Sequence, residues 1–306
     1  MSGILAVLTK SAAFILIIVM GYVLKRKGFF HPDDFYLISK IVIRITLPCA
    51  IISNFSNITM DRSLLFLCLL GIICNIVMVS IGYVTNLHRD GERKAFDMIN
   101  LSGYNIGNFT LPFVQSFLGP VGFAATSLFD AGNAVMCTGV TYTLASMVKG
   151  TGEKASVRNI VKSLLSSLPF DAYVIMTMLA MLELSLPDVI VSFAATVGAS
   201  NAFLALLMIG IGFEIRLGRD KLFWIFRLMA LRYGVALAFS LAGFYLLPFE
   251  LEVRQAMAIA AFGPVSSVAT AFTGRLGGDV EMSSAVNSMS IVLSMAAITV
   301  TLILVL

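Results

Sequence analysis

The sequence predicts an all-α membrane protein of ten transmembrane helices, arranged as two inverted repeats of five. Composition, the placement of basic residues and one central polar segment predict it. Of the 306 residues, 58% are hydrophobic and 12% are charged, and the mean hydropathy is +0.95. Soluble domains carry about 25% charged residues. The surplus apolar surface must therefore face lipid, and the length allows about ten spans of roughly 20 apolar residues with little room for a soluble domain.

Apolar runs separated by polar clusters give the individual spans. The first five are predicted at 4–24, 35–55, 64–84, 95–118 and 121–148. The second five are predicted at 168–184, 189–213, 222–247, 253–273 and 282–306. The sixth span is short and has Glu183 at its end.

Basic residues give the orientation, because loops rich in Lys and Arg stay in the cytoplasm. Connections that follow even-numbered spans contain only Arg62 and Arg254. Connections that follow odd-numbered spans contain Lys25, Arg26, Lys27, Arg89, Arg93, Lys94, Lys149, Lys154, Arg158, Lys162, Arg216, Arg219, Lys221 and Arg275. These connections are therefore expected in the cytoplasm, and both termini outside it.

The longest polar connection divides the chain into two halves. Residues 1–148 form the first predicted repeat, 149–163 a cytoplasmic loop and 164–306 the second repeat. Because each half has an odd number of spans, the halves insert in opposite orientations, as in transporters built from inverted repeats.

The fourth and ninth spans are interrupted at matching places. Small, polar and proline residues fill 101–112 and 261–270. Proline removes a helical donor and clashes with the carbonyl four residues earlier, so Pro112 would free the carbonyl of Asn108, and Pro264 that of Ala260. Irregular backbone at membrane depth persists only where protein or water satisfies it. Paired breaks of this kind indicate a binding site near the bilayer midplane.

Such a site would suit an anion, because half-helix N-termini present unpaired N–H groups and a positive dipole end. The alternative is that the interruptions form no binding site and that these residues only kink the helices or ease their packing. The substrate-binding residues predicted are Asn105, Gly107, Asn108, Pro112, Pro264, Ser266, Ser267 and Thr270.

Asp130 lies near the middle of the fifth span, with Asn133 one turn later. An acid at membrane depth costs at least about 2.5 kcal/mol on insertion scales, so it is usually placed for a function. Asp130 and Asn133 are predicted as a coupling or proton site. Asp130 could carry a proton, partner a cation such as Na⁺, or make a packing hydrogen bond as a protonated acid.

The remaining polar and reactive residues predict little chemistry. Arg44 and Arg232 are expected to snorkel or to support helix packing. Asn75 is expected to join helices. No cofactor, metal or disulfide is predicted, since the four cysteines lie in apolar stretches without a CxxC pair. They are Cys49, Cys68, Cys74 and Cys137.

The interrupted spans also resemble a known family. Asn105-x-Gly107-Asn108-x-x-Leu111-Pro112 is similar to the fourth-span signature of the auxin efflux carrier family, a member of the bile/arsenite/riboflavin transporter-like superfamily. The likeness covers nearly the whole chain. The long central hydrophilic loop of the plant carriers is absent here, so the chain resembles the short, bacterial type. Further similarities are Gly119, Gly122, Leu47-Pro48, the stretch 207–212, Pro264 and the stretch 274–279.

That resemblance implies that the broken fourth and ninth helices cross beside the substrate. It also implies a secondary carrier of organic anions in the inner cell membrane. The expected partners are a small organic anion, namely a carboxylate, and the lipid bilayer, without nucleic acid. A homodimer stays open, as does the coupling ion, H⁺ or Na⁺. Two residues depart from the family pattern, Gly274 where lysine is common and Asp130 itself.

Other functions fit less well. A channel could also be lined by broken helices. An intramembrane protease would need a histidine or a second acid at depth, but His31 and His88 lie in loops and Asp97 near an interface. We therefore expect no enzyme. The chain has no GxxxxGK[ST] loop for ATP.

Overall fold

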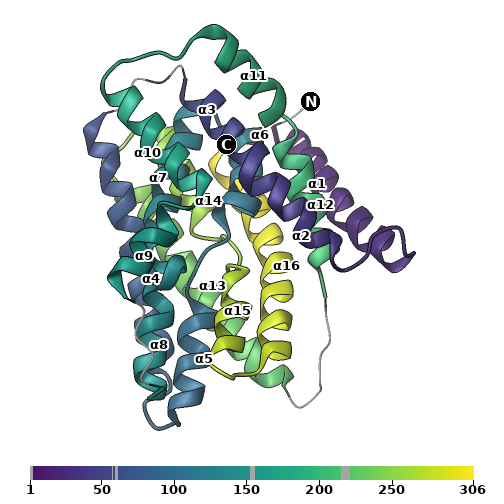
Figure 1. Cartoon of the computed structure of the whole chain (residues 1–306), viewed down its shortest axis with the longest axis vertical. Helices are drawn as coiled ribbons and strands as arrows, with labels where there is room; N and C mark the ends of the chain where they lie inside the picture. The colour runs from purple at the N-terminus through teal and green to yellow at the C-terminus, as the bar shows by residue number, and fades with distance from the viewer. Residues whose placement is uncertain (1–2, 57, 59–60, 152–155, 215–220) are drawn as a thin grey trace.

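The computed structural model describes residues 3–56, 58, 61–151, 156–214 and 221–306, and its regular elements in these ranges are helical (Figure 1). Three of the basic residues used to predict the orientation, Lys154, Arg216 and Arg219, lie outside the described residues.

Six helical stretches among the described residues are long and apolar enough to cross a membrane. A seventh arises if α9 and α10, which meet at a bend of 76°, count as one span. The elements concerned are α1 (Gly3–Arg26), α2 (Asp34–Ile41) with η1 (Val42–Thr46) and α3 (Leu47–Phe55), η2 (Arg62–Leu65) with α4 (Phe66–Val84), α9 (Val157–Leu164), α10 (Leu168–Met181), α11 (Asp188–Gly198) with α12 (Asn201–Gly212), α13 (Leu222–Tyr245) and α16 (Val280–Val305).

Shorter helices occupy the predicted fourth, fifth and ninth spans. The fourth and ninth are interrupted at 102–105 and 261–267, which confirms that neither is a continuous helix. Their pieces are too short to count as spans by length, so the ten-span topology stays a prediction. The elements are α5 (Gly91–Leu101), η3 (Ile106–Thr110), α6 (Leu111–Phe117), α7 (Pro120–Val135), η4 (Met136–Val140), α8 (Thr141–Lys149), α14 (Leu251–Ala260) and α15 (Val268–Arg275).

A Thr-Leu-Pro motif follows a π-helical turn in both the second and the fourth predicted spans. The N–H of Leu47 donates to the carbonyl of Val42, and that of Leu111 to the carbonyl of Ile106. The extra residue in a π turn helps a helix accommodate a proline, which has no N–H and crowds the preceding turn. Pro112 therefore sits in the first turn of α6. The interruption of the fourth span lies upstream of η3, at Gly103, and not at Pro112.

The segment predicted as a loop at 149–163 contains most of α9. Leu164 is buried and Ile160 is half-buried, whereas Arg158 and Lys162 are exposed. This spacing of apolar residues is typical of a helix that packs one face against the protein. The connection is therefore partly helical rather than a loop throughout.

The helices pack into two groups. In one, α1 packs along α12, and α3 packs against α10 and α11. In the other, α4 packs against α5 and α7, α13 against α14, and α15 against α16. Figure 1 shows α1, α2 and α12 on the right and α4, α5 and α8 at the lower left. The pieces of the two interrupted spans pack in the second group, and η3 and α6 also contact α12 of the first group.

A carboxylate from the second half of the chain caps a helix of the first half. Glu252, near the start of α14, accepts a hydrogen bond from the N–H of Gly122 at 2.7 Å, in the first turn of α7. An added Cβ would lie 3.0 Å from the Glu252 Oε1 at Gly119, and 3.2 Å from it at Gly122. The absence of side chains at Gly119 and Gly122 thus lets the Glu252 carboxylate reach the positive end of α7.

Candidate functional site

The two interruptions meet. Tyr104 and Val265 form an antiparallel β-bridge, the Asn105 N–H donates to the Pro264 carbonyl at 2.9 Å, and the Ser266 N–H donates to the Gly103 carbonyl at 3.3 Å. Backbone groups that the broken helices leave unpaired thus satisfy one another at this crossover, which we define as 102–105 with 261–267. The structure brings together the two segments that the sequence singles out.

Gly103 is required at this contact. Its φ is +72°, in the left-handed region that residues with a Cβ rarely adopt. An added Cβ would also lie 3.2 Å from the Cβ of Ser266 and 3.3 Å from the Cys137 Sγ. The crossing of the two segments therefore depends on a residue without a side chain here.

Two asparagines anchor the crossover from opposite sides. Asn133 on α7 donates to the Tyr104 carbonyl at 2.8 Å and accepts from the Tyr104 N–H at 3.0 Å. On α16, Asn287 donates to the Val265 carbonyl at 2.9 Å, and the Val265 N–H donates to the Ser290 hydroxyl at 3.0 Å. The bridge residues of the two halves thus have equivalent side-chain partners on the helix that follows each interrupted span.

Asn75 supports the same segment, because its side-chain oxygen accepts from the Gly103 N–H at 2.7 Å and its amide donates to Asn133 at 3.2 Å. This confirms its expected role in joining helices.

Arg232 is the cation of the crossover. It lies on α13, is 1% exposed and donates to the carbonyls of Leu101, Gly103 (3.0 Å) and Gly263 (2.8 Å). Leu101 ends α5, and Gly263 follows α14. The guanidinium thus faces the negative ends of both half-helices, where a cation is stabilising. Arg232 does not snorkel: it is a buried packing residue whose acceptors are backbone carbonyls.

Asp130 connects the two groups of helices. Its Oδ2 accepts from the Tyr173 hydroxyl of α10 at 3.0 Å, and its Oδ1 accepts from Asn133 at 2.9 Å. Gly107 lies beside it, since an added Cβ there would be 3.4 Å from Oδ2. The predicted coupling pair is therefore in direct contact, next to the turn that carries Asn108.

The structure distributes the predicted substrate residues around the crossover. Asn105 is 7% exposed, and the side-chain oxygen of Asn108 is buried without a hydrogen-bond partner in the described part of the chain. Gly263 packs on the turn containing Asn108, because an added Cβ would lie 3.1 Å from Ile106 and Thr110. Of the remaining predicted residues, Pro112 and Pro264 are buried, Gly107, Ser266 and Thr270 are half-buried, and Ser267 is exposed.

Two helix N-termini begin at the crossover. η3 and α6 follow Asn105, and α15 follows Ser267; neither of these residues caps its helix with its side chain. The first N–H groups of both helices are therefore free of side-chain caps, and the dipole there favours negative charge. With Arg232 on the opposing carbonyl ends, the local electrostatics suit an anion.

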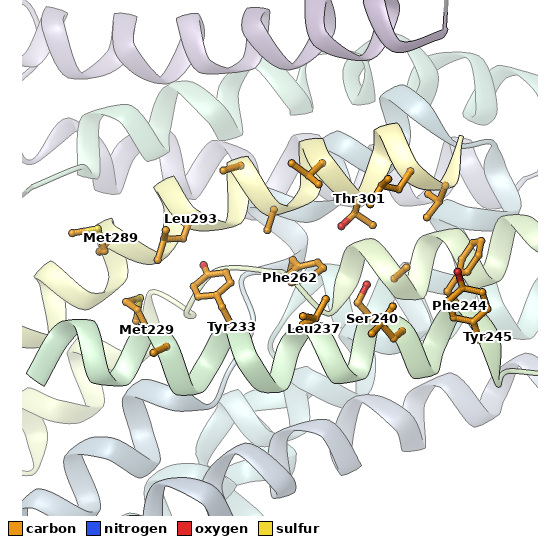
Figure 2. A pocket seen from close by; sticks show the side chains of 18 of the residues that line it. Met229, Tyr233, Leu237, Ser240, Phe244, Tyr245, Phe262, Met289, Leu293 and Thr301 are labelled. Carbon is orange, nitrogen blue, oxygen red and sulfur yellow. The ribbon is translucent and has the colours of Figure 1, made fainter.

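The crossover is closely packed in this conformation. A cavity between Gly103, Cys137, Thr141 and Ser266 has a volume of about 10 Å³, enough for about one water. A much larger groove, about 720 Å³, runs between α13 and α16, with Phe262 at its floor (Figure 2). Its lining is mainly apolar, with Tyr233, Ser240 and Thr301 among the few polar side chains. This groove suits an acyl chain rather than a charged solute, so we do not assign it as the substrate site.

Comparison with known proteins identifies the family. The family model described as "Membrane transport protein", of the auxin efflux carrier type, matches residues 6–305, nearly the whole chain. The chain belongs to this family. It is accordingly a multi-pass membrane transporter. No curated protein matches it.

Sequence reasoning missed several residues of this transporter's crossover. Tyr173, Asn287 and Ser290 were not singled out, and Arg232 was assigned only to snorkelling or packing. A detectable signal existed for Asn287, because it lies in the last predicted span as Asn133 does in the fifth. Tyr173 had no such signal, because its partner is 43 residues away and the pairing follows from tertiary packing.

Proposed function

We propose that this transporter is a secondary carrier of a small organic anion, a carboxylate, that works by alternating access. The observation that supports this most is the crossover, where two uncapped helix N-termini meet beside a buried arginine. The further elements of the proposal are ten spans in two inverted repeats, insertion in the inner cell membrane and termini outside the cytoplasm.

The anion would be held by backbone N–H groups at the starts of η3 and α15, together with the amides of Asn105 and Asn108. Helix N-termini bind carboxylates through such groups without a full positive charge. The side-chain oxygen of Asn108 has no hydrogen-bond partner in the described part of the chain, so it has no assigned structural task. Ser266, Ser267 and Thr270 add hydroxyls on the α15 side.

Transport requires the crossover to open, because its cavity of about 10 Å³ is too small for a carboxylate. We propose that the group containing α4, α5, α7 and α13–α16 moves as a body against the group containing α1, α3 and α10–α12. The hydrogen bond from Tyr173 to Asp130 spans these groups and would break or re-form during that motion. Asp130 is thereby the proposed site of coupling to H⁺ or Na⁺.

A test of this function uses purified protein in proteoliposomes. Vesicles preloaded with one unlabelled mono- or dicarboxylate are diluted into the same labelled compound, at two pH values, with and without sodium. A carrier gives saturable counterflow, in which label accumulates transiently above its equilibrium level. Conductance events with no counterflow would identify a channel and contradict the proposal.

A further inference from the structure

A second cluster of charges, half-buried at Arg93 and Arg227 and exposed at Arg89, lies away from the crossover, around the single tryptophan of the chain, Trp224. Three arginine guanidinium groups lie near its indole ring centre: Arg93 at 4.2 Å, Arg89 at 5.4 Å and Arg227 at 5.7 Å. Arg89 lies in the turn after α4, Arg93 at the start of α5 and Arg227 at the start of α13. We call these four residues the Trp224 cluster.

The cluster has more positive than negative charge. The buried carboxylate of Asp97 accepts from Arg227 at 2.8 Å and pairs with Arg93 at 3.2 Å. The carboxylate of Asp90 accepts the backbone N–H of Arg93 and so caps α5. In the described part of the chain, no carboxylate lies within ion-pair distance of Arg89. One guanidinium therefore faces the tryptophan and the solvent with an unused set of donors.

The surroundings of the cluster are those of a membrane interface. Phe223 is 68% exposed and Val84 57% exposed, and Leu87 is also exposed on the same connection as Arg89. Tryptophan is enriched where the bilayer meets water, and apolar side chains exposed beside it face acyl chains. An anion bound here would thus sit at headgroup level, with hydrocarbon next to it.

We propose that the Trp224 cluster binds the phosphate of an anionic phospholipid, with the acyl chains lying along Phe223, Val84 and Leu87. Arginine forks match phosphate oxygens in pairs, and the bound phosphate supplies the negative charge that Asp97 alone does not. Because the cluster joins α4, α5 and α13, the lipid would brace the group of helices that carries the crossover.

The test uses quenching of Trp224 fluorescence by brominated lipids, which is specific because the chain has no other tryptophan. The protein is reconstituted with brominated phosphatidylglycerol or brominated phosphatidylcholine over a range of mole fractions. The proposal predicts half-maximal quenching at a severalfold lower fraction of the anionic lipid. In Arg89→Gln that preference falls about fivefold, the contribution typical of one basic residue at an anionic membrane surface.

The matched control is Arg158→Gln, an exposed arginine on α9 that removes the same charge elsewhere. It should leave the lipid preference unchanged. Equal quenching by both lipids, or an unchanged preference in Arg89→Gln, would overturn the proposal. Protection of Trp224 from brominated phosphatidylglycerol by millimolar inorganic phosphate would assign the site to a soluble anion and overturn it too. None of these outcomes depends on transport, so they are independent of the proposed carrier function.

Discussion

Asn133 and Tyr104 form a reciprocal pair in which one side-chain amide binds both the N–H and the carbonyl of one backbone residue, at 3.0 and 2.8 Å. The Asn133 side chain also accepts a hydrogen bond from the Asn75 amide and donates one to Asp130. Its two donors and its acceptor oxygen are therefore all in use. Asn133 consequently positions the crossover and Asp130, rather than being available to a substrate.

Replacing Asn133 with Leu should destabilise the protein strongly. Two buried backbone groups of Tyr104 would lose their partner, at about 1–3 kcal/mol each. Thermal unfolding of the purified protein measures this loss as a lower melting temperature. Asn287→Leu should also lower the melting temperature, because it leaves the Val265 carbonyl without its donor. A melting temperature equal to wild type in Asn133→Leu would mean that the pairing contributes no stability.

Replacing Arg232 with Met should destabilise the protein, because each buried carbonyl that loses its hydrogen-bond donor costs about 1–3 kcal/mol. Three carbonyls at the ends of the half-helices would be left without their donor. Arg232→Lys should retain part of the stability, since one ammonium cannot reach all three acceptors. Arg44→Met, at an exposed arginine, is the control and should unfold like wild type. Similar stability of Arg232→Met and Arg44→Met would contradict the role assigned to Arg232.

Asp130→Asn should flatten the pH dependence of transport. An ionised Asp130 beside the crossover repels an anion, so uptake by the wild type should rise as the pH falls and the carboxylate takes up a proton. Asparagine carries no charge at any pH and keeps a hydrogen-bonding side chain. Initial uptake rates between about pH 5 and 8 measure the profile. Tyr173→Phe removes a hydrogen-bond donor to Asp130 but keeps the acid, so its uptake should still depend on pH. A profile in Asp130→Asn that matches the wild type would rule out Asp130 as the titrating group.

Asp279 should give stability that depends on pH. Burial raises the pKa of this carboxyl, but Lys221 at 2.7 Å and the N–H of Met282 outweigh that effect and leave the pKa below its usual value. A lowered pKa stabilises the fold above the unfolded value of about 3.9, and this contribution is lost as the pH falls through the folded pKa.

Asp279→Ala should therefore cost about 1 kcal/mol at pH 7, where both the cap and the charge are lost. The difference from wild type should shrink at acidic pH. Asp33→Ala, at a cap position without a capping hydrogen bond, is the control. The measurement is the free energy of unfolding of wild type and Asp279→Ala at pH 7 and below pH 4. A difference between them that grows on acidification would contradict a lowered pKa of Asp279.

The sequence predicted those parts of the fold that depend on local pattern. Apart from α9, which lies in the predicted connection, the helices overlap the predicted apolar runs. The two interruptions occur in the predicted spans, because proline, glycine and small polar residues disfavour a continuous helix there. The exact position of the fourth-span break was not predictable from Pro112. A π turn accommodates that proline, and the left-handed Gly103 makes the break instead.

The partners of the crossover could not be predicted in the same way. The carbonyls bound by Arg232 are 131, 129 and 31 residues away along the chain, and only the packing of α13 across both half-helices brings them together. A lone arginine in an apolar run is compatible with snorkelling, and its burial is a property of the tertiary structure.

The proposed carrier function is tested most directly by the amides of Asn105 and Asn108. Asn105→Ala and Asn108→Ala are compared with Asn159→Ala, at an exposed position on α9, for carboxylate counterflow at equal amounts of folded protein in liposomes. Loss of one hydrogen bond to a charged ligand, about 1.5–3 kcal/mol, predicts at least a tenfold loss of uptake in each crossover variant and none in the control. Full uptake by both crossover variants would show that the substrate binds elsewhere.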